Sequence, residues 1–197
     1  LPAGGIKSGF TFLDPLKGWI TGSEPVNDFV YLYRTTDGGT TWAHQPCDIA
    51  DADPDAMYNS FPPIFVSETE GFLPLQTFLM DGTAQTIVCK TTDGGQTWQS
   101  VSSAPIQGYV FDFTDGQNGW ILGETALFRS TDGATTWEDL SSSLPAGYTA
   151  LSLDFVDEQA GWLLVYDSSS DSLDHNLLFY SQNGGQTWVQ LDARMGD

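Results

Sequence analysis

The chain has 197 residues, of which 40% are hydrophobic and 13% aromatic, enough for one packed domain of ordinary size. Its 26 acidic residues against 6 lysines and arginines give a net charge of −20. This balance excludes nucleic acid and anionic membranes as partners, because binding phosphates requires basic side chains. No apolar run approaches the length of a membrane span, so no spanning segment is expected.

Along the chain, one unit recurs four times, and each copy has two recognisable parts. The first part is an alternating apolar run, a turn and a Gly-aromatic pair. In chain order these pairs end at Trp19, Phe72, Trp120 and Trp162. The second part, called the box here, follows the pattern Ser/Thr-x-Asp-x-Gly-x-Thr-Trp. The boxes occupy residues 34–42, 90–98, 129–137 and 180–188, with Ala134 and Asn183 as departures from the pattern.

Each unit predicts four short strands: an apolar strand, a Gly-aromatic strand, a strand leading into the box, and an outer strand opening at Thr-Trp. The spacing of the boxes fits four-stranded propeller blades. The sequence therefore predicts an all-β fold, a β-propeller of four four-stranded blades within a single domain spanning residues 1–197. The four blades form either a small closed ring or part of a larger propeller. They are expected near residues 8–46, 59–103, 107–142 and 148–193.

The box itself predicts a hairpin turn between the third and fourth strands of each blade. Its acid should accept hydrogen bonds from backbone N–H groups of the same turn, and glycine should supply the positive φ that the turn needs. The closing tryptophan is expected to fold inward between neighbouring sheets, with a sugar-stacking platform as the alternative. The residues assigned to this structural role are Asp37, Gly39, Trp42, Asp93, Gly95, Trp98, Asp132, Trp137, Asn183, Gly185 and Trp188.

These boxes resemble the Asp-box, or bacterial neuraminidase, repeat. The fuller unit, with Gly-Trp ahead of "TTDGGQTW", most resembles the propellers of photosystem II assembly factors and their bacterial relatives. Similar boxes occur in sialidases, xyloglucan-cleaving hydrolases and sortilin-type receptors. The resemblance covers roughly residues 9–191 and implies an architecture, because one fold hosts many activities. The photosystem relatives imply a role in assembling a membrane complex, although they are described as using a basic patch that this chain lacks.

Propeller topology also sorts the loops onto two faces, and in related propellers ligands usually bind the face opposite the boxes. That face should hold residues 21–29, 46–61, 79–85, 100–107, 123–125, 140–149 and 166–177, which carry eleven acids and no lysine or arginine. The two longest insertions, residues 47–60 and 167–176, each occur in one unit only, so the repeat does not need them to fold. The candidate binding face is Asp48, Asp51, Asp53, Asp55, Asp171, Asp174 and His175, and it is expected to attract a basic protein or a divalent cation.

One part of this face is similar to the start of a calcium-binding loop. Asp51, Asp53 and Asp55 alternate as calcium ligands do, and carboxylate oxygens suit that ion. However, Ala56 stands where such a loop has glycine, and Pro62 where it has glutamate. Calcium is therefore the minor hypothesis and a solvated acidic loop the major one, and no other cofactor is expected.

The two cysteines are expected to be separate. Cys89 occupies a core column shared with Tyr33, Phe128 and Phe179, and Cys47 follows the outer strand of the first unit. The two cysteines are expected near opposite ends of their blades, too far apart for a bridge. A disulfide between them is the alternative. The chain begins at Leu1 rather than Met, which favours a removed leader and an extracytoplasmic location.

The basic residues argue against catalysis of the sialidase type. Sialidases clamp a carboxylate with three arginines, and this chain has Arg34, Arg129 and Arg194. The first two share one repeat column with Lys90 beside the boxes and cannot converge on the opposite face. Other glycosidases need two suitably spaced carboxylates, but the xyloglucan hydrolases use two large propellers around a cleft. We predict a non-catalytic binding or scaffold propeller, with assembly of an envelope or membrane complex as one use. A carbohydrate-active or carbohydrate-binding propeller is the alternative, so the expected partner is a protein or a carbohydrate.

Overall fold

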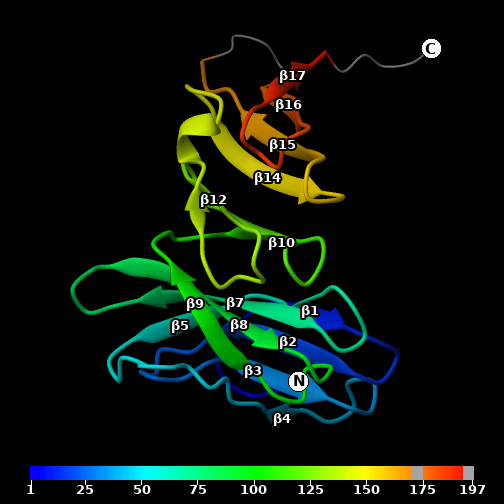
Figure 1. The fold of residues 1–197 in the computed structure, drawn as a ribbon. Coiled ribbons are helices and arrows are strands. Elements are labelled where there is room, and N and C mark those ends of the chain that lie inside the picture. The colour runs from blue at the N-terminus through cyan, green and yellow to red at the C-terminus, as the bar shows by residue number, and fades with distance from the viewer. Residues whose placement is uncertain (170–174, 193–197) are drawn as a thin grey trace. The chain divides into compact units, whose positions relative to one another are not determined.

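The computed structural model describes residues 1–169 and 175–192, in which the regular secondary structure is β apart from one 3-10 turn at Ser141–Ser143 (Figure 1). The chain forms two compact units, residues 1–107 and 108–197. The first unit contains strands β1 to β9 and the second contains β10 to β17. The predicted all-β class is confirmed, whereas a single domain over residues 1–197 stays a prediction.

In the second unit, both sheets are four-stranded antiparallel blades whose strands pair in chain order. The third predicted blade consists of β10 (Val110–Phe113), β11 (Gly119–Leu122), β12 (Leu127–Ser130) and β13 (Glu138–Asp139). The fourth, yellow to red in Figure 1, consists of β14 (Thr149–Phe155), β15 (Gly161–Tyr166), β16 (Asn176–Ser181) and β17 (Val189–Leu191). This up-and-down order is the one that the repeat predicts.

The first unit holds the first two predicted blades, joined into one nine-stranded sheet. The first blade consists of β1 (Ile6–Phe12), β2 (Gly18–Ser23), β3 (Leu32–Thr35) and β4 (Ala43–His44). The second consists of β6 (Ile64–Phe65), β7 (Gly71–Phe78), β8 (Ala84–Thr91) and β9 (Gln99–Ala104). Between them lies β5 (Met57–Ser60), which pairs with both β2 and β7.

Strand β5 falls within residues 46–61, which the sequence predicts to be a loop, so the loop prediction is wrong for these four residues. Met57 is exposed, whereas Tyr58 and Ser60 are buried. The Ser60 hydroxyl donates to the carbonyl oxygen of Tyr31 at 2.6 Å and accepts the backbone N–H of Gly22 at 2.9 Å. Burial alternates along this short strand, but one of its buried residues is a serine. The sequence therefore lacks the alternation of apolar and polar residues that would predict a strand.

The four boxes form one recurring turn between the third and fourth strands, as predicted. In the first, Asp37 accepts the backbone N–H of Thr41 at 2.8 Å and its hydroxyl at 2.6 Å. The Thr35 hydroxyl donates to Asp37 at 2.8 Å and accepts the Gly39 N–H at 2.9 Å. Equivalent bonds surround Asp93 and Asp132. Asn183 accepts the matching bonds through Oδ1, but its Nδ2 donates to the hydroxyl of Thr187 at 2.9 Å. The outer strands begin after the tryptophan, slightly later than predicted.

The pattern's glycine position requires a left-handed backbone in every box. Gly39, Gly95 and Gly185 have φ values of 88°, 71° and 91°. Ala134 holds the same position at φ 67°, although this conformation costs a residue with a Cβ roughly 1–2 kcal/mol. The turn thus retains its shape in the third blade because the hydrogen bonds of Ser130 and Asp132 determine it.

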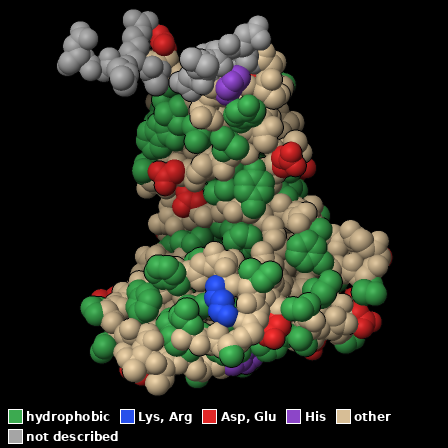
Figure 2. Space-filling view, turned by 180° about the vertical axis from the view of Figure 1, so that it is seen from behind, with side chains coloured by type: hydrophobic (Ala, Val, Ile, Leu, Met, Phe, Trp, Pro, Cys, Tyr) green, Lys and Arg blue, Asp and Glu red, His purple; other side chains and the backbone are tan. Residues whose placement is uncertain are grey.

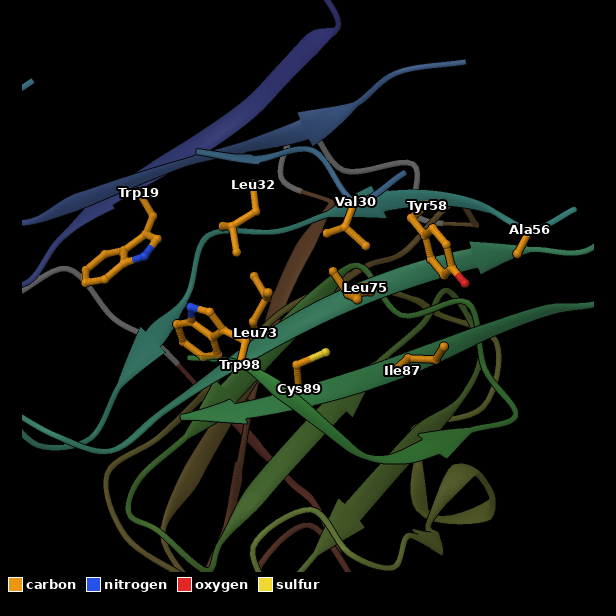
Figure 3. Packing of buried hydrophobic residues seen from close by; sticks show 10 residues of the cluster. All are labelled: Trp19, Val30, Leu32, Ala56, Tyr58, Leu73, Leu75, Ile87, Cys89 and Trp98. Atoms are coloured by element: carbon orange, nitrogen blue, oxygen red, sulfur yellow. The ribbon is translucent and has the colours of Figure 1, made fainter. Parts of the chain in front are cut away.

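The tryptophans pack into the blades, but not all to the same depth. Trp19 and Trp120 are fully buried and Trp98 is 2% exposed. The remaining four, Trp42, Trp137, Trp162 and Trp188, are half-buried. In the first unit Trp19 and Trp98 meet edge to face, with ring centroids 6.5 Å apart. They belong to a cluster that also contains Val30, Leu32, Leu73 and Leu75 (Figure 3).

The separate placement predicted for the cysteines is wrong, because Cys47 and Cys89 form a disulfide. The segment after β4 turns back along β9 instead of leaving the blade. There Asp48 donates its N–H to the carbonyl oxygen of Trp98 at 2.9 Å and accepts the N–H of Ser100 at 2.8 Å. This short parallel pairing brings Cys47 beside β8, where Cys89 is fully buried.

Candidate binding site in the first unit

A cavity of about 430 Å³ lies in the first unit, beside the insertion of residues 47–60. We call it the insertion cavity. Three of the loops that the sequence places on the ligand face, residues 46–61, 79–85 and 100–107, contribute to its wall. The lining residues are Ile49, Ala50, Asp51, Ala52, Asp53, Ala56, Tyr58, Thr77, Leu79, Gln85, Ile87, Ser100, Val101, Ser102 and Ser103.

The backbone of the insertion is held against β9 at one end of the cavity. Besides the two bonds of Asp48, the N–H of Ala50 donates to the Ser100 hydroxyl at 2.9 Å. At Asp51 the chain adopts a φ of 52° and turns away from the strand. The disulfide at Cys47 fixes the start of this segment. One wall of the cavity is therefore tied to the blade by covalent and backbone contacts.

The cavity floor is formed by the buried cluster of the first unit. Tyr58, Ala56 and Ile87 lie at one end of this cluster, away from Trp19 (Figure 3). Burial raises the pKa of the Tyr58 hydroxyl, and the nearby carboxylates of Asp28 and Asp53 raise it further. The floor of the cavity at Tyr58, which is 2% exposed, therefore lies in a negative electrostatic potential.

A second hydroxyl-bearing residue, Thr77, also lines the cavity. Thr77 is 1% exposed, and its Oγ1 atom has no hydrogen-bond partner within the described chain. Buried hydroxyls are nearly always hydrogen-bonded, so an unpaired one at a cavity wall calls for an explanation. Its position beside Tyr58, across the β5–β7 pairing, places both hydroxyl-bearing residues on the same wall.

The acids of the predicted binding face divide into three groups. Asp51 and Asp53 line the insertion cavity, whereas Asp48 and Asp55 do not. Asp171 and Asp174 lie outside the described residues. His175 belongs to the second unit, where its Nδ1 lies 3.1 Å from the carbonyl oxygen of Asp167.

The calcium hypothesis for Asp51, Asp53 and Asp55 is not supported by their geometry. Across residues 1–169 and 175–192, no group of three or more acidic, histidine or cysteine side chains converges as a metal ion requires. Asp53 instead uses Oδ1 to accept the N–H of Asp55 at 2.9 Å, closing a local turn. The carboxylate of Asp53 therefore stabilises a local turn, and Asp51 and Asp53 also line the cavity.

The second unit has a smaller cavity of about 330 Å³ formed by its own loops. Residues 124–125 and 141–148 contribute to it, again from segments that the sequence assigns to the ligand face. Its lining contains a single acid, Glu124, and lacks a paired insertion segment.

Figure 2 shows that acidic side chains are scattered over the face in view rather than gathered into one patch. The insertion cavity is thus distinguished by its wall and not by acidity alone.

Sequence reasoning missed Gln45, a buried residue just after the first box. Its Oε1 accepts the Trp19 indole N–H at 2.9 Å, and its Nε2 donates to the carbonyl oxygens of Gly95 and Gln96, each at 2.8 Å. It therefore links the two blades that support the cavity. A glutamine after a tryptophan gives no periodic signal, and only its position two residues before Cys47 could have drawn notice.

Comparison with known proteins identifies the fold and a family. The sequence model of the family described as Sortilin-Vps10 (Sortilin, neurotensin receptor 3) matches residues 86–197. No curated protein sequence matches the chain. Among solved structures, "YCF48 bound to D1 peptide" is similar over 96% of this chain and 83% of its own, with 19% identity and a TM-score of 0.54. At that identity the likeness shows the β-propeller fold alone.

Proposed function

The chain belongs to the Sortilin-Vps10 family, whose model matches more than half of it, and we propose that it is a non-catalytic propeller that binds a protein partner through the insertion cavity. The observation that carries this proposal is the cavity wall itself. An insertion that the repeat does not need is fixed to the blade by a disulfide and by backbone bonds, and it forms one wall of an open cavity of about 430 Å³. Preformed concave sites of this size are typical of ligand-binding regions.

A non-catalytic role is supported by how the arginines are used. Arg34 lies over the ring of Trp19 at 5.8 Å, and Arg129 over the ring of Trp120 at 5.4 Å. Arg129 also donates to the carbonyl oxygen of Glu158 at 2.7 Å. Both side chains are therefore occupied by blade packing instead of meeting a substrate. Arg194 lies outside the described residues.

A protein partner is favoured over a carbohydrate by the structural neighbour, which was solved in complex with a peptide. The Asp-box character of the repeat also supports a scaffold propeller. We propose that its binding serves the assembly of an envelope or membrane complex. In the described part of the chain, no helix has the length and hydropathy needed to cross a membrane. The Cys47–Cys89 disulfide favours an oxidising, extracytoplasmic compartment.

Selection of displayed peptides against the purified chain tests the proposal. Ala52 is exposed at the cavity wall, so Ala52→Trp should fill the mouth without disturbing the core. Ala146→Trp places the same bulk in the second unit's cavity and is the matched control. Peptides selected on the native chain should lose at least tenfold in affinity for Ala52→Trp and less than twofold for Ala146→Trp.

If Ala146→Trp abolishes binding and Ala52→Trp leaves it intact, the partner does not bind in the insertion cavity. Hydrolysis of aryl glycosides by the native chain would contradict the non-catalytic part and favour the carbohydrate-active alternative.

A further inference from the structure

Neighbouring blades pack in the same way at two places in the chain. In the first unit, the ring of Trp19 on β2 lies against Phe65 on β6, with centroids 4.8 Å apart. In the second unit, Trp120 on β11 stacks on Phe155 on β14, with centroids 3.8 Å apart. In both cases the Gly-Trp ring of one blade meets the inner-strand phenylalanine of the next.

The box of the next blade completes each interface by holding the indole N–H. Trp120 donates directly to the carbonyl oxygen of Gly184 at 3.0 Å. Trp19 donates to Gln45, whose Nε2 donates to the carbonyl oxygen of Gly95. We call the side of a blade that presents the Gly-Trp ring its Trp face, and the side that presents the inner-strand phenylalanine and the box its Phe face. Each interface therefore pairs a Trp face with the Phe face of the next blade.

The first blade presents a Phe face that its own unit leaves uncovered. Phe10 and Phe12 on β1 stand at the positions that Leu153 and Phe155 occupy in the fourth blade. The two residues of the fourth blade are 6% and 4% exposed, because the third blade packs on them. Phe10, by contrast, is 70% exposed and Phe12 is 42% exposed. Exposed apolar side chains that match buried ones in the same repeat indicate a surface for a protein partner.

This Phe face already has the geometry of a complete interface. The ring of Phe12 meets the box ring of Trp42 edge to face, with centroids 6.2 Å apart. In the fourth blade, Phe155 meets Trp188 in the same way at 6.0 Å. The face therefore needs no rearrangement of these rings to receive the Trp face of another blade.

The fourth blade presents a Trp face on the opposite side from its own core. Trp162 and Leu164 on β15 pair directly with Tyr180 and Leu178 on β16, so the four side chains lie on one side of the sheet. All four are partly exposed, whereas the other side of these strands belongs to the buried cluster of the second unit. The described residues of the second unit thus leave this Trp face partly uncovered.

The third blade shows how deeply such a face is buried when a blade follows it. The counterparts there of the tryptophan and the two leucines are Trp120, Leu122 and Leu127. All three are 0% exposed and belong to the cluster that also contains Phe155. The Trp face of the fourth blade therefore lacks the cover that the repeat provides elsewhere.

We propose that copies of this chain associate head to tail, with the Trp face of the fourth blade in one copy packed on the Phe face of the first blade in the next. A second copy is the partner because this chain carries both halves of an interface that it forms twice within itself. Such a contact is heterologous, so each copy uses two different surfaces. None of the residues on these two faces lines the insertion cavity, so the inference is independent of the proposed function.

Sedimentation velocity of the whole chain over a concentration series tests the proposal, and the native chain should associate reversibly. Phe10→Glu places a carboxylate in the Phe face, and Leu164→Glu places one in the Trp face. Each should weaken association at least tenfold, because the interface would bury an unpaired charge. Met80→Glu adds the same charge at a residue that is 78% exposed on the turn between β7 and β8, and it should change association less than twofold.

Mixing the two interface variants distinguishes a head-to-tail contact from the pairing of like faces. The Phe10→Glu copy retains its Trp face and the Leu164→Glu copy retains its Phe face, so an equal mixture can form one interface. The mixture should restore association and stop at one copy of each variant. Tyr180→Glu, on the same face as Leu164, should behave as Leu164→Glu does in both experiments, which separates loss of the face from a folding defect at one position.

A native chain that stays monomeric throughout the concentration series overturns the proposal. If Phe10→Glu abolishes association while Leu164→Glu and Tyr180→Glu do not, first blades pair with each other and the head-to-tail contact is wrong. A mixture of folded variants that stays monomeric contradicts the contact as well.

Discussion

Replacing Gln45 by alanine should destabilise the fold well beyond the loss of one polar side chain. Gln45 is 8% exposed and makes three side-chain hydrogen bonds, one to the indole of Trp19 and two to the box backbone at Gly95 and Gln96. Stranding the fully buried indole N–H costs about 1–3 kcal/mol, and the lost bond to the buried Gly95 carbonyl adds about 1 kcal/mol. The expected loss is therefore about 2–4 kcal/mol, or roughly 5–15 °C in Tm for a domain of this size.

Urea unfolding followed by tryptophan fluorescence measures this loss directly. Gln99→Ala, an exposed glutamine at the start of β9, is the matched control and should change stability by less than about 0.5 kcal/mol. Gln45→Glu keeps the acceptor for Trp19 but sets a carboxylate against two carbonyl oxygens, so it should be at least as damaging as alanine. If Gln45→Ala unfolds at the same urea concentration as Gln99→Ala, the bridging role assigned to Gln45 is wrong.

Three further outcomes are expected. Trp98→Ala should cost about 3–5 kcal/mol in urea unfolding, because it opens a cavity beside a residue that is 2% exposed. Hydrogen bonds from Thr41, then Thr35, lower the pKa of Asp37 from 3.8 to about 2, so its contribution is complete above about pH 4 and is lost as the pH falls towards 2. Asp37→Asn should reduce, without abolishing, the pH dependence of the unfolding free energy over this range, since an amide does not titrate there while Asp93 and Asp132 still do. Reducing the native chain with dithiothreitol should lower Tm and expose Cys47 to alkylation, and Tm insensitive to reduction would contradict the disulfide.

The repeat made the blades predictable because each box specifies its turn locally. An acid, a left-handed glycine position and a hydroxyl two residues before the acid are enough to set the bonds seen around Asp37. Those contacts span at most four residues, so they can be inferred without knowing the rest of the fold. The strand order of the second unit was also predictable, because in each of its blades the strands pair in chain order.

Contacts made over long sequence separations could not be inferred in this way. The Cys47–Cys89 bridge spans 42 residues, and Gln45 reaches a carbonyl 50 residues away. Both depend on the insertion turning back along β9, which no periodic pattern encodes. The sequence did place Asp51 and Asp53 in an insertion on the ligand face, but it predicted a solvated acidic loop, with calcium as the minor hypothesis, and did not predict the cavity that these residues line.

The central claim is that a partner segment binds in the insertion cavity, and amide chemical shifts of the ¹⁵N-labelled chain test it most directly. Titration with a peptide selected by display on the native chain should perturb residues 49–53, 77–87 and 100–103. Shifts confined to the box turn at residues 35–42, or to the second unit, would contradict the claim even if the peptide binds.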